Sequence, residues 1–63
     1  MGIKDRLRME YTARRFAVVI NDRIYWYSFR DMAQSRFDAE LRVVQLWDMH
    51  DQDDPVLLQE KKG

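Results

Sequence analysis

Cysteine is absent from this 63-residue chain, and histidine occurs once, as His50. Disulfides and thiolate zinc sites are therefore excluded, and we expect neither a metal nor a cofactor. A domain this short buries only about 60% of the surface that its unfolded chain exposes. Small domains usually need a further source of stability. Association, with a second copy or with a target, is the source that remains.

Glycine, proline and long apolar runs are also scarce, with two glycines and one proline in the chain. The longest apolar run, residues 16–20, is too short to span a bilayer, and the N-terminus lacks the apolar stretch of a signal peptide. A hydrophobic content of 46% is too high for a disordered chain. We expect one cytoplasmic α+β domain over residues 1–58, without membrane contact, and a frayed tail over residues 59–63.

A β-hairpin is the clearest local pattern. Residues 16–20 are apolar and residues 23–29 are rich in aromatics, and Asn21-Asp22 stands between them. Both turn residues tolerate the positive φ of a two-residue turn. Such a turn places Ile20 opposite Arg23 and makes both faces of the hairpin apolar. We therefore expect both faces to be covered.

Upstream of the hairpin, apolar residues alternate with polar ones from Leu7 to Ala13. This period of two predicts a further strand, and hence a hairpin or a three-stranded sheet over about residues 6–29. Ile3, Leu7 and Tyr11 would also fit a short helix, but we favour the strand.

Downstream, residues 29–54 contain neither glycine nor proline, and apolar residues recur at helical spacing. The stripe consists of Ala33, Phe37, Leu41, Val44 and Trp47. It predicts one long amphipathic helix over about residues 29–50. The alternative is a ββαβ arrangement with a short helix over residues 29–39 and a strand over residues 41–47. The segment 55–59 could add a strand to the sheet or dock onto a partner.

The long helix would also imply a partner. About 22 helical residues extend about 33 Å, whereas hairpin strands of about seven residues reach only about 23 Å. The apolar stripe would continue onto the overhang, and soluble monomers rarely expose such a patch. We therefore expect a homodimer.

No catalytic arrangement is recognisable. Ser28 and Ser35 lack an activating base, and His50 beside acidic residues is typical of a solvated surface. The acidic residues after position 47 fail the EF-hand pattern, because its sixth position holds Asp53 instead of glycine. They fit either a solvated linker or a surface for a basic partner. We expect neither an enzyme nor a small-molecule substrate.

Charge is balanced overall but divided along the chain. Residues 1–30 hold seven basic and three acidic side chains, a net of +4, and residues 31–63 hold four basic and eight acidic, a net of −4. Such asymmetry either marks a binding face or is neutralised within the fold.

By elimination, the chain acts by binding. We expect a small dimeric regulator or inhibitor of a larger host protein, of a size common among phages and mobile elements. One alternative is a nucleic-acid-binding regulator that uses the arginine-rich N-terminal strands, which a net charge of zero disfavours. Another alternative is a structural subunit of a larger assembly. The candidate partner-binding residues are Arg14, Arg15, Tyr25, Trp26, Tyr27, Trp47, Asp48, Asp51, Asp53 and Asp54.

Overall fold

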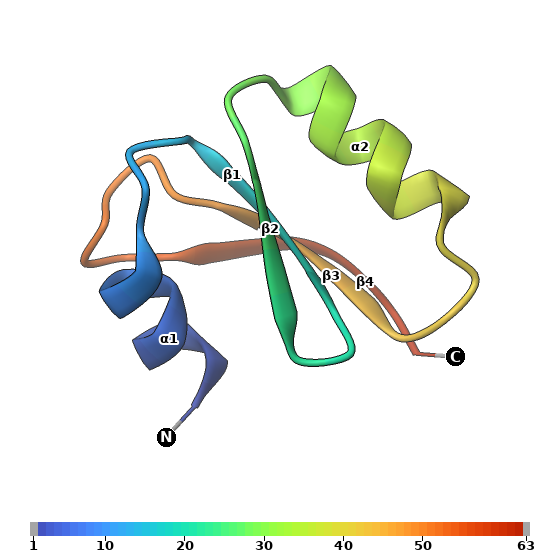
Figure 1. Cartoon of the computed structure of the whole chain (residues 1–63), viewed down its shortest axis with the longest axis horizontal. Coiled ribbons are helices and arrows are strands. Elements are labelled where there is room, and N and C mark those ends of the chain that lie inside the picture. The colour runs from blue at the N-terminus through green and yellow to red at the C-terminus, as the bar shows by residue number, and fades with distance from the viewer. Residues whose placement is uncertain (1, 63) are drawn as a thin grey trace.

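Four strands form one antiparallel sheet, and a short helix lies against each of its faces (Figure 1). The computed structural model describes residues 2–62. The elements, in chain order, are α1 (Ile3–Glu10), β1 (Phe16–Ile20), β2 (Arg23–Tyr27), α2 (Arg30–Ala39), β3 (Val44–Asp48) and β4 (Val56–Lys61). The strand order is β2-β1-β3-β4, so β2 and β4 form the two edges. The predicted α+β class is confirmed, with four strands instead of the predicted hairpin or three-stranded sheet.

The β1–β2 hairpin has the register that its turn predicts. Ile20 lies opposite Arg23, and the pairing continues to Phe16 opposite Tyr27. Asn21 and Asp22 have φ values of 49° and 66°, in the left-handed region that a two-residue turn requires. The turn therefore fixes which side chains of the hairpin point to each face of the sheet.

Both faces of the sheet are apolar, as the hairpin pattern predicts, and β1 is buried along its whole length. One cluster lies between the sheet and α2 and consists of Phe16, Val18, Ile20, Ala33, Phe37, Val44 and Leu46. The other lies on the α1 side and consists of Leu7, Ala17, Val19, Trp47 and Met49. The chain thus covers both faces with its own helices.

The prediction of one helix over residues 29–50 is wrong. Helix α2 ends at Ala39, Glu40 has an extended backbone, and the chain returns to the sheet as β3. A distant side chain holds this end, because Lys61 Nζ donates to the carbonyl oxygens of Phe37, Asp38 and Glu40 at 2.9, 3.2 and 3.0 Å. The Phe37 carbonyl also accepts from the backbone N–H of Glu40 at 3.3 Å, so Lys61 adds to the backbone capping of a helix end whose last carbonyls have no intrahelical partners.

The ββαβ alternative is close to the observed order of elements, with a helix over residues 30–39 and a strand over residues 44–48. The predicted overhang of a long helix beyond the sheet is therefore absent. The argument from helix length to a homodimer is lost with it.

The predicted strand upstream of the hairpin is also wrong, since residues 3–10 form α1. Leu7 is buried in the α1-side cluster, but Met9 is 72% exposed, so the alternation of apolar residues there does not reflect a buried face. Arg6 pairs with Glu10 at 3.1 Å, one helical turn away, which stabilises the helix. Ala13, at φ 66°, reverses the chain between α1 and β1. Neither helix of residues 2–62 is long and apolar enough to cross a membrane.

Strand β4 pairs antiparallel with β3 and completes the sheet. Its register shifts beside Leu46 and Trp47, where Gln59 and Leu57 are the partners and Leu58 is left between them as a bulge. Segment 55–59 thus contributes to a strand added to the sheet, which is the first of the two possibilities predicted for it. Residues 59–61, expected in a frayed tail, form the end of β4, and Gly63 of that tail lies outside the described residues.

Replacing Leu7 by alanine tests how firmly α1 is docked. Leu7 is fully buried, so we expect Leu7→Ala to lower the free energy of unfolding by about 2–5 kcal/mol. In a domain of this size such a loss approaches the total stability. Urea denaturation followed by circular dichroism measures it. Met9→Ala, on the exposed side of the same helix, serves as the control and should stay within about 0.5 kcal/mol of the wild type. Equal effects of the two changes would mean that α1 is not packed on the sheet.

Candidate functional site

The outer edge of β2 presents backbone groups that the sheet does not use. In an antiparallel ladder, alternate residues turn their N–H and C=O groups toward the same neighbour. The two-residue turn makes Ile20 and Arg23 a hydrogen-bonded pair, so Arg23, Tyr25 and Tyr27 turn their backbone groups toward β1. Those of Ile24 and Trp26 therefore point away from β1. Arg14 Nη1 donates to the carbonyl oxygen of Trp26 at 3.3 Å, in agreement with this geometry. The edge is therefore open to an added strand.

A groove of about 530 Å³ follows this edge, and we call it the β2-edge groove. Its lining residues are Thr12, Arg14, Ile24, Tyr25, Trp26 and Tyr27. Four of them, Arg14 and the three aromatics, are among the candidate partner-binding residues of the sequence. The structure therefore brings together residues that the sequence places on different elements.

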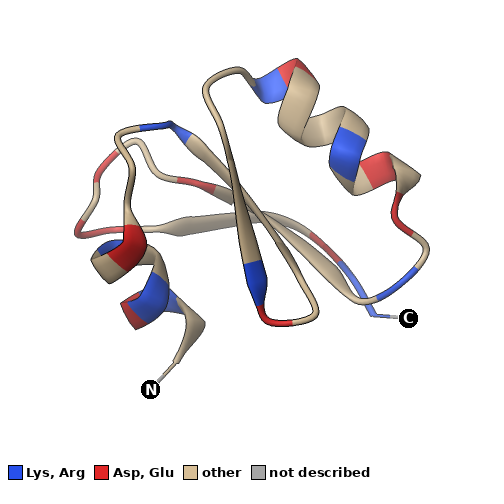
Figure 2. Cartoon of the chain, in the orientation of Figure 1, with Lys and Arg blue, Asp and Glu red and all other residues tan. Residues whose placement is uncertain are grey.

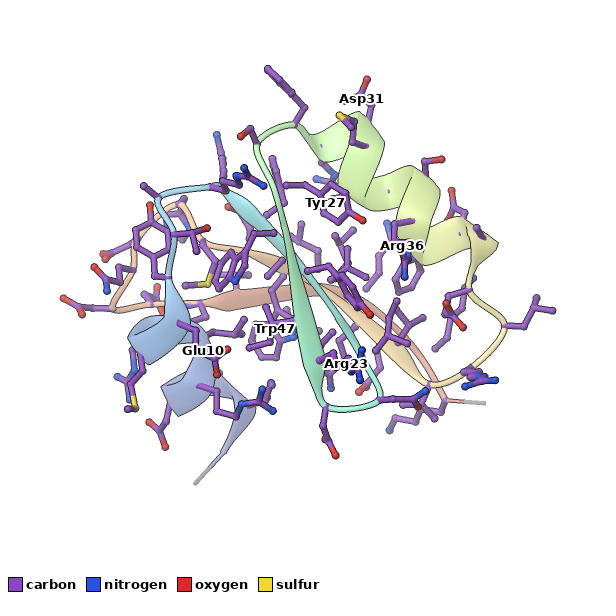
Figure 3. The ribbon with its side chains drawn as sticks, in the orientation of Figure 1. Glu10, Arg23, Tyr27, Asp31, Arg36 and Trp47 are labelled. Atoms are coloured by element: carbon purple, nitrogen blue, oxygen red, sulfur yellow. The ribbon has the colours of Figure 1, made fainter. Side chains whose placement is uncertain are left out.

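The aromatic side chains of β2 lie on opposite sides of the sheet. Tyr25 and Tyr27 pack against the α2-side cluster, and Trp26 packs on the α1 side. Tyr11 meets the Trp26 ring edge-on, with ring centroids 6.0 Å apart, and the Arg36 guanidinium lies 4.6 Å from the Tyr25 ring centroid. Figure 3 shows Tyr27 and Arg36 on the α2 side of β2. The three rings therefore do not form one continuous stacking surface.

Basic side chains border the β2-edge groove. Arg14 lines it, Arg23 begins the strand, and Arg36 covers Tyr25 from α2. Figure 2 shows basic positions at the start of β2, on α2 and in the segment before β1. Of the acids near the ends of this strand, Asp22 lies in the turn directly before Arg23, and Asp31 accepts a hydrogen bond from the backbone N–H of Met32 at 2.9 Å. The groove is thus bordered by basic side chains at Arg14 and Arg36, while Arg23 has Asp22 beside it.

Arg15 and Asp48, two further candidates, bind each other. Arg15 Nε and Nη2 donate to the two carboxylate oxygens of Asp48 at 3.2 and 3.3 Å, a bidentate pair. These hydrogen bonds raise the pKa of Arg15. Among residues 2–62 this is the ion pair that joins the basic half of the chain to the acidic half. For these two side chains, the asymmetry of charge is neutralised within the fold.

His50 lies beside that ion pair, with Nδ1 4.0 Å from the Asp48 carboxylate. It borders a small hollow of about 290 Å³ together with Tyr11, Ala13, Arg15 and Met49. Both carboxylate oxygens of Asp48 accept hydrogen bonds from Arg15, so Asp48 is not free to orient the imidazole of His50. The hollow therefore lies where the segments before β1 and after β3 meet, and we assign it no catalytic role.

Trp47 lies in the core, 4% exposed, and its indole Nε1 donates to Gln45 Oε1 at 3.0 Å. A partner cannot reach this ring without opening the α1-side cluster. The loop before β4 holds the remaining candidates, where Asp51 Oδ1 accepts from the N–H of Asp53 at 3.0 Å and Asp51 O accepts from the N–H of Asp54 at 3.0 Å. The described residues contain no cluster of potential metal ligands there or elsewhere.

Sequence reasoning missed three residues at the β2-edge groove: Thr12, Ile24 and Arg36. The hairpin register could have placed Ile24 beside Trp26 on the open edge, because both have outward backbone groups. Arg36 could not be found in this way, since its position depends on how α2 crosses the sheet.

Comparison with known proteins gives no match: no protein-family model fits the chain, and neither the curated proteins nor the solved structures contain a significant relative. Function is therefore inferred from the geometry of the chain itself.

The two tryptophans should differ in their access to solvent. We expect acrylamide to quench the fluorescence of Trp26 more efficiently than that of Trp47, because Trp47 is buried. Trp47→Phe and Trp26→Phe isolate each emission for Stern–Volmer measurement. The Stern–Volmer constants of the two variants should converge when both are unfolded in urea. Equal quenching in the folded variants would contradict the buried position of Trp47.

Proposed function

We propose that this chain is a non-enzymatic protein-binding module that takes an extended segment of a larger protein as an added strand along β2. The observation behind the proposal is the open β2 edge, lined by a groove in which Arg14 meets Tyr25, Trp26 and Tyr27. Strand addition is a recurring mode of peptide recognition, in which main-chain hydrogen bonds give affinity and side-chain pockets give specificity. We further propose that the module works in the cytoplasm as a regulator or inhibitor of its target.

Main-chain pairing would use the outward N–H and C=O groups of Ile24 and Trp26. An exposed edge strand is a template for pairing with another chain, and proteins often protect such edges with charged side chains. Here Arg14 hydrogen-bonds the Trp26 carbonyl from an exposed position. An incoming strand would displace this guanidinium from the carbonyl and leave it free to bind an acidic group.

The border of the groove favours a segment that carries carboxylates. Arginine presents a planar fork that matches a carboxylate, and Arg14, Arg23 and Arg36 lie at different points along β2. Apolar side chains at alternate positions of the segment would lie beside Ile24 and Trp26. We therefore propose an extended segment in which acidic and apolar residues alternate.

A nucleic-acid partner is supported less well. Single-stranded bases bind best where successive rings stack on aligned aromatics, but Trp26 faces the opposite side of the sheet from Tyr25 and Tyr27. The net charge of zero is also unlike that of most nucleic-acid-binding domains. The same experiment separates this alternative from the protein partner.

Panning a phage-displayed library of random peptides against the immobilised chain tests the proposal. We expect it to select extended peptides with alternating apolar and acidic residues, whose binding to the chain changes the fluorescence of Trp26. Ile24→Pro removes one outward N–H without touching the pairing to β1, as proline is tolerated on an edge strand. We expect it to weaken binding about tenfold relative to Ile24→Ala, which loses the same apolar contact but keeps the N–H.

Circular dichroism verifies that both Ile24 variants remain folded. Equal affinity of the two variants for the selected peptides would show that they bind elsewhere. Failure to select any peptide, together with binding of an oligothymidylate that weakens steeply with salt, would favour the nucleic-acid alternative.

A further inference from the structure

We infer that β4, the opposite edge of the sheet, pairs with β4 of a second copy of this chain in antiparallel fashion across a two-fold axis. The two sheets would then join into one continuous sheet. This inference goes beyond the proposed function and does not depend on it, because it concerns the other edge.

Strand β4 is open and carries apolar side chains at that edge. It has β3 on one side and no strand on the other, among residues 2–62. Val56 is 38% exposed and Leu57 is 41% exposed. An exposed edge with such side chains is an expected site of pairing between chains.

The face beside β4 is incompletely covered on the α1 side. Leu57 lies opposite Trp47, which places it on that side, and Val43 is 55% exposed just before β3. A groove of about 400 Å³ opens farther along this face, between α1 and the end of β1, and no residue of β4 lines it. Its lining residues are Ile3, Val19, Asn21, Asp22, Val43 and Gln45. A second copy at β4 would therefore meet the free backbone groups of the strand and the exposed side chain of Leu57.

Charge identifies the partner as a second copy. The loop before β4 holds Asp51, Asp53 and Asp54, and Lys62 follows the strand. Arg42 lies at the same end as Lys62, because Val44 pairs with Lys61. Figure 2 shows acidic positions at one end of β4 and basic positions at the other, with one acidic position beside them. That acid, Glu60, lies 4.0 Å from Lys62 and accepts from Gln45 at 2.7 Å.

Antiparallel pairing across a two-fold axis near the middle of β4 places the start of each strand beside the end of the other. The acidic loop of one copy then lies beside Lys62 of the other, and the contact occurs twice. The same operation at β2 would bring Arg23 of one copy near Arg14 of the other, a contact between like charges. Self-association therefore favours β4 over β2.

The interface is small. A pair of short strands with a few apolar side chains falls at the low end of specific interfaces, below about 1,200 Å². We expect a dissociation constant of roughly micromolar order. Sedimentation equilibrium of the wild-type chain between about 1 and 200 µM covers this range.

A charge exchange tests which edge is used. Lys62→Glu and Asp54→Lys each replace two attractive contacts in the proposed dimer by two repulsive ones, and both residues are exposed, so neither change should disturb the fold. We expect each single variant to dimerise about tenfold more weakly. An equimolar mixture of the two should recover the wild-type affinity, because both contacts of the mixed dimer are attractive. The double variant should recover it as well.

Ile24→Pro provides the control at the other edge and should leave dimerisation unchanged. A wild-type chain that remains monomeric at about 200 µM would overturn the inference. So would a mixture of Lys62→Glu and Asp54→Lys that associates no better than either variant alone. Loss of the dimer in Ile24→Pro would place the contact at β2 instead. Peptide binding at the β2-edge groove is measured separately, so either proposal can fail without the other.

Discussion

Both faces of the sheet must be kept from water, and residues 2–62 provide two short helices to cover them. Strand β1 is buried throughout, with one apolar cluster above it and another below it. Covering them uses α1 on one side and α2 on the other. No element remains to close the sides of the sheet, so β2 and β4 stay at its edges. The backbone groups along the outer edges of β2 and β4 thus stay accessible because both helices are used to cover the faces of the sheet.

The two edges differ in ways that follow from the sequence around them. Strand β2 begins with Arg23 and is bordered by Arg14 from the segment before β1 and by Arg36 from α2, and three of its own side chains are aromatic. Strand β4 has opposite charges at its two ends and aliphatic side chains between them. A strand with one sign of charge along it suits a partner of the other sign, while a strand with opposite ends is complementary to itself. One small sheet can in this way bind a peptide segment at one edge and a second copy of the chain at the other.

The parts of the fold that could be predicted are those determined by neighbouring residues. Asn21 and Asp22 set the hairpin turn, which fixes the register and the side chains on each face, and thereby gathers Tyr25 to Tyr27 beside Arg14. The end of α2 could not be predicted in this way, because it is held by Lys61 more than twenty residues later. The sequence pattern likewise predicted Trp47 to be a partner-binding residue on a helix. Its position in the core depends on the pairing of β3 with β1, which local spacing does not reveal.

The backbone conformation of Ala13 affects how α1 separates from the sheet during local unfolding. Its φ of 66° costs an L-residue other than glycine roughly 1–2 kcal/mol, and it lies at the junction of α1 with the sheet. Proteins open locally, one segment at a time, before they unfold as a whole. Release of α1 would relieve this strain and uncover Trp47 and Met49 while the hairpin remained intact. The apolar surface that such an opening exposes is the surface through which a partly unfolded copy of this chain would aggregate or be cleaved.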